Sequence, residues 1–370
     1  QQDTQQTMLY PAEVELPEAT RPILDRIQDY RPQRLVIDSR SEFRLLARHE
    51  RYFRRQIVAL KEYLAEQGCT TLILDSRVAS LQDKPVQTVA SGVVQFELVT
   101  PEFGPFRRRL QIRKIRGLSY SSGYHDYVIR RGGIVVYPRL VASQHRRNYE
   151  AGELVSNNPG LDALVGGGLD KGTSTAVIGP AGVGKSSIAM QYIYAAAERG
   201  QGGAIYAFDE RIETILRRAS GLGMDLKRHV NDGLVRLQQL DPAEMTPGEF
   251  SQRVRRDVQQ GKEIIVIDSL SGYFQAMPEE NLLMLHMHDL LAYLNGQGVV
   301  TLLVIAQHGF LGPHMEPPLD ISYVADTVLL LRFFEYAGEV RKAISTLKRR
   351  SGVHEHSLRE IQLTSEGLWI

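Results

Sequence analysis

Residues 179–186 read Gly179-Pro180-Ala181-Gly182-Val183-Gly184-Lys185-Ser186, and they match the phosphate-binding pattern G-x-x-x-x-G-K-[ST]. In this pattern the glycines let backbone N–H groups curl around phosphate oxygens, the lysine reaches the β- and γ-phosphates, and the serine hydroxyl ligates Mg²⁺. We therefore expect residues 179–187, Ser187 included, to bind ATP and Ser186 to bind Mg²⁺. The alternative is an ordinary glycine turn.

The residues on either side support the phosphate-binding interpretation. Thr175–Ile178 is a short apolar run typical of a buried strand, and residues 186–199 have the pattern of a helix that ends at Gly200. A strand, a glycine turn and a helix N-terminus together hold an anion on free N–H groups and the helix dipole. The predicted fold class is therefore α/β.

Length and composition exclude several classes of protein. The 370 residues suggest two domains, and the net charge of +1 gives no global field toward nucleic acid or an anionic membrane. The longest apolar runs, such as Val299–Ala306, are far shorter than a membrane span. The single cysteine, Cys69, permits no internal disulfide and fits a reducing, cytoplasmic environment. The first residue is Gln1 and not methionine, so we expect the chain to be part of a longer product.

Two parts of the chain resemble each other at a nearly constant offset. Residues 34–39 resemble residues 264–269, and residues 68–72 resemble residues 298–302, both at an offset of 230. Residues 114–117 resemble residues 348–351 at an offset of 234. Two copies of one α/β domain explain such a repeat. The first-copy counterparts of Asp268, Lys348 and Arg350 are then Asp38, Lys114 and Arg116.

The offset also predicts how the two copies divide the chain. The P-loop of the first copy would lie before residue 1, so we expect residues 1–140 to be the C-terminal part of a first domain that lacks its P-loop. Residues 141–156 are expected to be a linker, since this stretch is polar and leads into Asn-Asn-Pro-Gly. Residues 157–370 are expected to form one complete domain. We also expect the parent protein to carry a first P-loop on the N-terminal side.

An acidic pair follows the next predicted strand. Residues 203–208 read as a buried strand, and Asp209 and Glu210 come directly after it. Open α/β sheets bind ligands at the C-terminal ends of their parallel strands. We therefore expect Glu210 to orient or deprotonate the attacking water, with Asp209 beside it. The alternative is that one of these acids caps a helix over residues 212–221.

A second strand-end aspartate has the pattern of a Walker B strand. Glu263–Asp268 is an apolar run closed by Asp268, which we expect to hold Mg²⁺ through water opposite Ser186. The alternative is an aspartate that caps a loop. The next predicted strand, Thr301–Ala306, carries Gln307 and His308 at its tip. Gln307 could sense the γ-phosphate or be an ordinary loop amide.

Two cations stand out near the C-terminus. Residues 340–348 and 357–363 look like a hairpin or edge strands, with Lys348 and Arg350 between them. In a lone domain these cations would be a solvated charge run. Phosphoryl transfer, however, needs cationic charge on the γ-phosphate, and a neighbouring subunit commonly supplies it. His354 and His356 are expected to lie in a surface loop and not to bind a metal.

The motifs above resemble those of a known family, and the resemblance spans nearly the whole chain. Two further stretches ahead of the P-loop contribute to it: Asn158-Pro159-Gly160-Leu161-Asp162 and Gly166-Gly167-Gly168-Leu169. The chain resembles the KaiC branch of the RecA superfamily, above all the bacterial KaiC-like ATPases with two tandem domains. The resemblance implies a RecA-like P-loop NTPase, with a mostly parallel central sheet flanked by helices. It implies a homo-hexamer of two stacked tiers with ATP between subunits. It further implies that Lys348 and Arg350 reach the neighbour's nucleotide, as Lys114 and Arg116 do in the first copy.

The chain departs from the clock protein of this family at two places. That protein carries a Glu-Glu pair where this chain has Asp209 and Glu210, so we assign the catalytic role to the longer Glu210. Its phosphorylated serine and threonine correspond to Ser322 and Tyr323. Ser322 is therefore a candidate phosphoacceptor, the alternative being an ordinary loop or strand residue. An ordered two-site cycle is not expected with Tyr323.

These observations favour an ATP-hydrolysing, hexameric signalling protein, with serine autophosphorylation as an activity that Ser322 leaves open. Its partners would be further copies of itself and signalling proteins; a membrane or nucleic-acid partner is not expected. One alternative is a RecA- or RadA-like DNA-binding ATPase, because residues 101–150 hold eleven Lys/Arg against three Asp/Glu. The other is a nucleotide-stabilised scaffold with negligible turnover. Catalytic roles are assigned to five residues: Glu210, Asp209, Lys185, Lys348 and Arg350.

Overall fold

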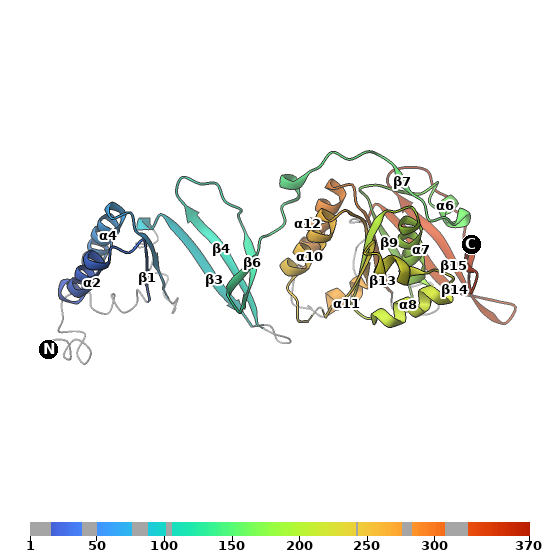
Figure 1. The fold of residues 1–370 in the computed structure, drawn as a ribbon. Helices are drawn as coiled ribbons and strands as arrows, with labels where there is room; N and C mark the ends of the chain where they lie inside the picture. Colours follow the sequence, from blue (N-terminus) through green and yellow to red (C-terminus); the bar gives the residue numbers. More distant parts are fainter. Residues whose placement is uncertain are drawn as a thin grey trace. The chain divides into compact units, whose positions relative to one another are not determined.

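The computed structural model describes residues 16–38, 50–75, 88–100, 106–241, 243–275, 283–307 and 325–370. The chain divides into two compact units, which are described separately. One unit holds Gln1–Gln95 and Ile112–Tyr120, and the other holds Phe96–Gln111 and Ser121–Ile370. The second unit contains a large sheet with helices on both of its faces (Figure 1).

Among the described residues, this sheet has nine strands in the order β11-β10-β12-β13-β9-β14-β15-β16-β17. Neighbouring strands from β11 to β14 are parallel, and those from β14 to β17 are antiparallel. The expected α/β class is confirmed, with an antiparallel edge added to the parallel centre. The strands are β9 (Ser174–Gly179), β10 (Gly202–Ala207), β11 (Val235–Gln239), β12 (Lys262–Asp268), β13 (Val300–Ala306), β14 (Thr327–Tyr336), β15 (Glu339–Arg349), β16 (Arg359–Thr364) and β17 (Gly367–Trp369).

The central strands are buried on both faces, so their side chains enter two separate hydrophobic cores. In β9, Val177 belongs to one core, while Ala176 and Ile178 belong to the other. In β12, Val266 and Ile267 divide in the same way. Side chains alternate between the two faces of a strand, which is why parallel strands covered by helices are apolar throughout.

Helices complete each core. The first core is covered by α7 (Lys185–Glu198), α8 (Ile212–Gly221) and α9 (Leu226–Asn231), and the second by α10 (Pro247–Gln259), α11 (Leu270–Gln275) and α12 (Leu283–Gly296). Two of these helices begin with ordinary caps. Asp225 accepts a bond from the Arg228 N–H in α9, and Thr246 accepts one from the Glu249 N–H in α10.

Short elements lead into β9, and their glycines and caps have clear physical roles. The elements are η1 (Ala142–His145), β7 (Glu153–Leu154), α6 (Pro159–Leu164) and β8 (Leu169–Asp170), with β7 and β8 paired. Asn158 caps α6 by accepting the Leu161 N–H at 3.0 Å. Gly166 has φ +76°, and a Cβ there would lie 2.2 Å from the Val353 carbonyl oxygen. Only glycine fits that position.

The N-terminal unit contains α2 (Leu16–Tyr30), β1 (Arg34–Ile37), α4 (Glu50–Glu66) and β2 (Thr70–Ile73). Strands β1 and β2 are parallel, and Ile27, Leu64 and Cys69 form a small core. A four-stranded sheet, in the order β3-β4-β5-β6, follows along the chain; its strands are β3 (Gly92–Val99), β4 (Arg107–Ile115), β5 (Tyr124–Arg130) and β6 (Gly133–Tyr137).

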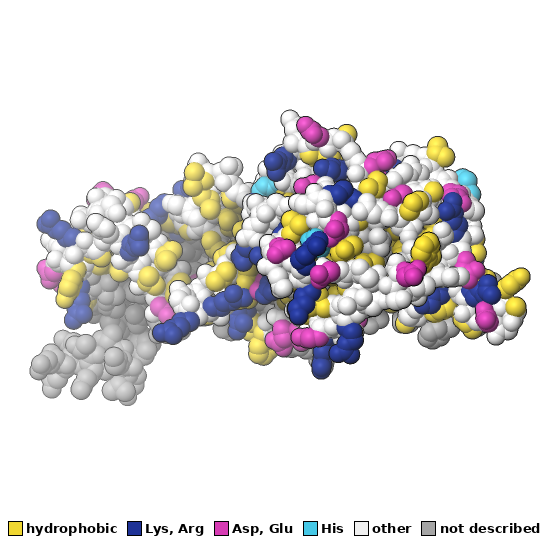
Figure 2. Space-filling model, turned by 45° about the vertical axis from the view of Figure 1, so that its right-hand side comes forward, with side chains coloured by type: hydrophobic (Ala, Val, Ile, Leu, Met, Phe, Trp, Pro, Cys, Tyr) yellow, Lys and Arg dark blue, Asp and Glu magenta, His cyan; other side chains and the backbone are white. Residues whose placement is uncertain are grey.

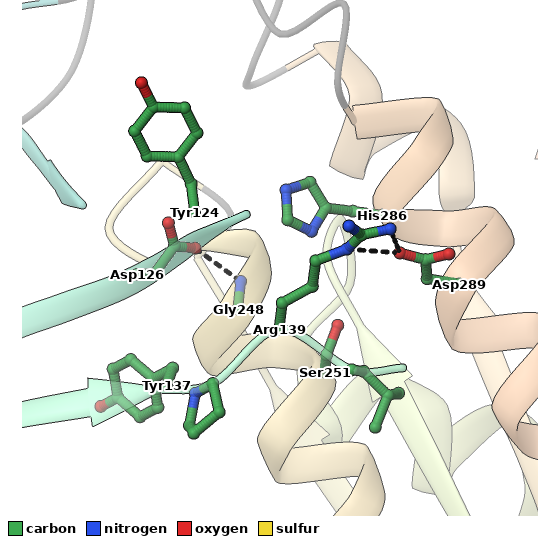
Figure 3. A pocket seen from close by; sticks show the side chains of 10 residues that line it. Tyr124, Asp126, Tyr137, Arg139, Gly248, Ser251, His286 and Asp289 are labelled. Atoms are coloured by element: carbon green, nitrogen blue, oxygen red, sulfur yellow. Dashed lines mark hydrogen bonds and ion pairs between the residues drawn. The ribbon is translucent and has the colours of Figure 1, made fainter. Parts of the chain in front are cut away.

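Polar contacts join β5 and the residues after β6 to α10 and α12 within the second unit. Asp126 accepts the Gly248 N–H at 2.7 Å, and Arg139 pairs with Asp289 at 3.0 Å (Figure 3). Asp126 thus satisfies a free N–H in the first turn of α10, where a negative charge also suits the helix dipole.

In the part of the chain that the structure describes, no helix combines the length and apolar character needed to span a bilayer.

A buried carboxylate on α10 generates a stability prediction. Asp257 is fully buried and accepts bonds from the Tyr206 hydroxyl at 2.6 Å and the Gln238 amide at 2.9 Å, and it pairs with Arg236. We expect Asp257→Ala to lower the free energy of unfolding by about 3 kcal/mol, because the buried donors lose their acceptor. Urea denaturation measures this. The exposed Asp232→Ala is the control, and equal stabilities of the two variants would contradict the prediction.

Candidate nucleotide-binding site

The glycine loop after β9 has the backbone of a phosphate cradle. Gly182 and Gly184 have φ +78° and +115°, in the left-handed region that favours glycine. Gly179 lies so close to β14 that a Cβ would come within 2.5 Å of the Leu331 carbonyl oxygen. Gly184 is the N-cap of α7 and has no side chain with which to cap it. The first N–H groups of α7 are therefore open to an anion.

Lys185 is folded back onto the loop that precedes it. Its side chain is almost fully buried, and its Nζ donates to the Pro180 carbonyl at 2.8 Å. Burial lowers the pKa of Lys185, and the nearby Asp268 carboxylate acts in the opposite direction. A buried ammonium needs strong acceptors, so phosphate oxygens would replace the Pro180 carbonyl favourably.

Asp268 closes β12 beside the P-loop and meets Ser186. Burial raises the pKa of Asp268, while a hydrogen bond from the Ser186 hydroxyl and the charges of Arg218 and Lys185 lower it. A hydroxyl and a carboxylate are hard oxygen donors of the kind that suit Mg²⁺. Within the described ranges, no group of three or more His, Cys, Asp or Glu could hold a metal. A magnesium ion here would take its other ligands from phosphate and water.

The two acids after β10 have different surroundings. Glu210 Oε1 accepts from the Arg218 guanidinium at 2.8 Å. Asp209 accepts from the Ser269 hydroxyl and lies against Gly272, where a Cβ would come within 2.3 Å of its carboxylate. The N-cap of α8 is Arg211, so neither acid occupies the capping position. Asp209 is therefore tied to the residues after β12, whereas among the described residues Glu210 is held by the helix that follows it in the chain.

Strand register brings these residues to one edge of the sheet. Ala207 of β10 is paired with Asp268 of β12, and Ala306 of β13 is paired with Gly179 of β9. The Gln307 N–H donates to the Gly179 carbonyl at 3.0 Å. The Gln307 side chain is buried, and its Oε1 has no hydrogen-bond partner among the described residues. The P-loop, both acids, Asp268 and Gln307 therefore share the C-terminal edge of the parallel strands.

Lys348 and Arg350 lie at the opposite end of the sheet. Lys348 is paired with Val328, whose own partner in β9 is Ala176, near the start of that strand. The Lys348 Nζ donates to the Ala325 carbonyl at 3.0 Å, and half-exposed Arg350 pairs with Asp326 at 3.3 Å. One protomer thus does not bring these cations to its own P-loop.

The remaining predicted residues divide between described and undescribed segments. Asp38 is exposed directly after β1. The Lys114 and Arg116 side chains both donate to the Thr88 carbonyl, at 2.9 and 2.8 Å. Ser322 and His308 lie outside the described residues.

Three residues of the site were not singled out from the sequence. Ser269 donates to Asp209, Gly272 leaves room for the Asp209 carboxylate, and Arg218 donates to Glu210. Ser269 directly precedes α11, and its hydroxyl accepts the Gly272 N–H at 3.0 Å as an N-cap serine does, so a helix-start signal was present. Arg218 carries no such local signal.

Comparisons with known proteins show the family of the chain. A family model described as "ATPase: KaiC" matches residues 2–141 and 156–370. The protein "Circadian clock oscillator protein KaiC" of Parasynechococcus marenigrum (strain WH8102) is 25% identical over 347 residues, which are 92% of this chain and 67% of that protein. The protein of the same name from Synechococcus elongatus is 26% identical over 345 residues, 92% of this chain and 66% of that protein. The chain spans about two thirds of the length of these relatives. The chain belongs to the KaiC ATPase family, as the sequence motifs predicted.

The buried lysine gives a prediction for nucleotide binding. We expect Lys185→Ala to weaken ATP binding about 10- to 100-fold, because one charge-assisted contact to phosphate is lost. Titration with a fluorescent ATP analogue measures the dissociation constant. The exposed Lys227→Ala is the matched control, and a Lys185→Ala affinity equal to that of this control would contradict the prediction.

Proposed function

We propose that this member of the KaiC ATPase family binds Mg²⁺ and ATP at residues 179–187 and hydrolyses the ATP. The observation that carries the proposal is the convergence of the glycine loop, Asp268 and Glu210 at one edge of the sheet. Open α/β sheets bind ligands at this edge, and phosphoryl transfer needs little beyond positioning and charge stabilisation there.

Each residue of the edge has a role in this proposal. Backbone N–H groups of the loop and of α7 bind the phosphate oxygens, and Lys185 exchanges the Pro180 carbonyl for the β- and γ-phosphates. Ser186 and Asp268 would hold Mg²⁺, which supplies charge neutralisation on the phosphates. Glu210 has one carboxylate oxygen on Arg218 and its second oxygen available to orient the attacking water.

The proposal includes a homo-hexamer in which Lys348 and Arg350 reach the nucleotide of a neighbouring subunit. The position of these cations supports it, since within one chain they lie at the end of the sheet away from the P-loop. A cation supplied in trans is a recurring part of phosphoryl transfer.

We further propose that residues 1–140 are the C-terminal part of a first domain, that residues 141–156 are a linker, and that residues 157–370 are the complete copy. Two pairs of residues support the duplication. Asp38 follows β1 as Asp268 closes β12, and Lys114 lies in β4 as Lys348 lies in β15. In both regions a parallel strand pair precedes antiparallel strands.

The DNA-binding alternative is less well supported. Several basic residues of the 101–150 stretch already have acidic partners, because Arg109 pairs with Glu97 and Arg130 with Glu249. Figure 2 shows acidic side chains among the basic ones on the face in view. A basic groove for nucleic acid would need a continuous run of one sign.

A mixing experiment tests the trans assignment. Arg350→Ala should lose about 10³–10⁵-fold in hydrolysis rate, and Lys185→Ala should also be inactive. A mixture of the two variants should regain phosphate release, because the intact P-loop of one meets the intact Arg350 of the other. Arg341→Ala, on strand β15 that precedes Arg350, is the control with unchanged activity. No recovery in mixed assemblies, confirmed by co-purification of two tags, would overturn the trans role.

The role of Glu210 separates an ATPase from a scaffold. Glu210→Gln should slow phosphate release about 10²–10⁴-fold with ATP affinity retained, because a neutral amide cannot act as a base. Equal, near-zero rates of wild type and variant would support the scaffold instead.

Mass spectrometry of the wild-type reaction also tests the proposed autokinase activity, which predicts a phosphate on Ser322. An unmodified peptide would remove that activity from the proposal.

A further inference from the structure

Within the described residues, the side chain that hydrogen-bonds to the proposed catalytic acid, Glu210, is Arg218. It lies in the last turn of α8, and its guanidinium donates to Glu210 Oε1 at 2.8 Å. Ile215 and Ala219, on the same helix, are buried in the first core and fix the helix against the sheet. Arg218 is therefore presented by a rigid element, whereas Glu210 lies in the irregular turn between β10 and α8.

The Arg218 guanidinium also lies within electrostatic reach of Asp268. Its charge lowers the pKa of Asp268, whereas the Glu210 carboxylate raises it. Glu210 and Asp268 thus repel one another at the edge of the sheet, and Arg218 is attracted to both. The positive charge of Arg218 offsets part of this repulsion.

The ion pair leaves hydrogen-bonding atoms of both side chains available. Only Oε1 of Glu210 is engaged by Arg218, so Oε2 can accept from a water. The Arg218 Nε is buried and has no hydrogen-bond partner within the described ranges. The side chains of Arg218 and Glu210 are 30% and 26% exposed, so the pair is neither a freely solvated surface pair nor a fully dry one.

We propose that Arg218 is a positioning residue for hydrolysis, which fixes the Glu210 carboxylate so that its second oxygen faces the attacking water. This inference rests on the proposed function. Arg218 acts through Glu210 and does not itself bind the phosphates. Its loss therefore affects the chemical step and not the affinity for ATP. An inhibitory clamp, in which the ion pair withholds Glu210 from the water, makes the opposite prediction.

The test uses the full chain and measures ATP affinity and single-turnover phosphate release separately. Arg218→Ala should slow phosphate release about 10- to 100-fold and change ATP affinity less than about threefold, since one charge-assisted hydrogen bond is lost from the chemical step alone. Arg218→Lys keeps the positive charge but replaces the planar guanidinium with an ammonium group, so its rate should lie between those of Arg218→Ala and wild type. Arg217→Ala removes the adjacent exposed arginine of α8 and should leave both quantities unchanged.

A double variant decides whether Arg218 acts through Glu210. Adding Arg218→Ala to Glu210→Gln should slow phosphate release no further, because coupled residues are non-additive. Three results would overturn the inference. They are a double variant whose loss of rate is the product of the two single losses, an Arg218→Ala variant that is faster than wild type, and an Arg217→Ala variant that loses as much rate as Arg218→Ala. If Glu210→Gln itself leaves the rate unchanged, the proposed function fails. If Glu210→Gln is slow but Arg218→Ala is not, only the role of Arg218 fails.

Discussion

The register of four parallel strands is the constraint on which the candidate site depends. Pairing of Ala207 with Asp268 and of Ala306 with Gly179 sets the loop, the acids and the polar strand tips at a common edge. Because side chains alternate between faces, a shift of one residue in any of these strands would turn its buried side chains toward the wrong core. The two hydrophobic cores therefore fix the strand register, and the register positions the residues of the candidate site at one edge of the sheet.

The charged side chains at this edge have partners within one chain. Asp268 has Ser186, Lys185 and Arg218 nearby, and Glu210 has Arg218. Lys185 meanwhile donates to a backbone carbonyl, which is a weaker partner than a phosphate. With Asp209, the edge holds three carboxylates against two cations, Lys185 and Arg218. The positive charge that an incoming polyanion requires would therefore come in part from the backbone N–H groups of the loop and from Mg²⁺.

The sequence was most informative where function requires a contiguous pattern. The P-loop and Asp268 at the end of β12 follow from local strand and turn signals, and the predicted helix over residues 186–199 differs from α7 by one residue at each end. Arg218 escaped prediction because its approach to Glu210 depends on the turn over residues 208–211 and on how α8 packs, neither of which has a local signal. The opposite location of Lys348 likewise follows from strand pairing over 150 residues of chain separation, which no window of sequence contains.

Chain direction explains why Lys348 and Arg350 cannot join the P-loop of their own protomer. Strand β14 runs parallel to β9, toward the loop, and β15 returns antiparallel, so residues at the end of β15 arrive where β9 begins. Lys348 is level with Ala176, three residues before Gly179, which is about 10 Å along β9 at roughly 3.3 Å per residue. Two strand spacings of about 4.8 Å separate β15 from β9, so the loop lies beyond the reach of this side chain, and Arg350 starts further from the loop still. Any role for these cations at a nucleotide must therefore involve a second protein surface. A stack of identical protomers provides such a surface in its simplest form, because heterologous contact places one end of a subunit against the other end of the next.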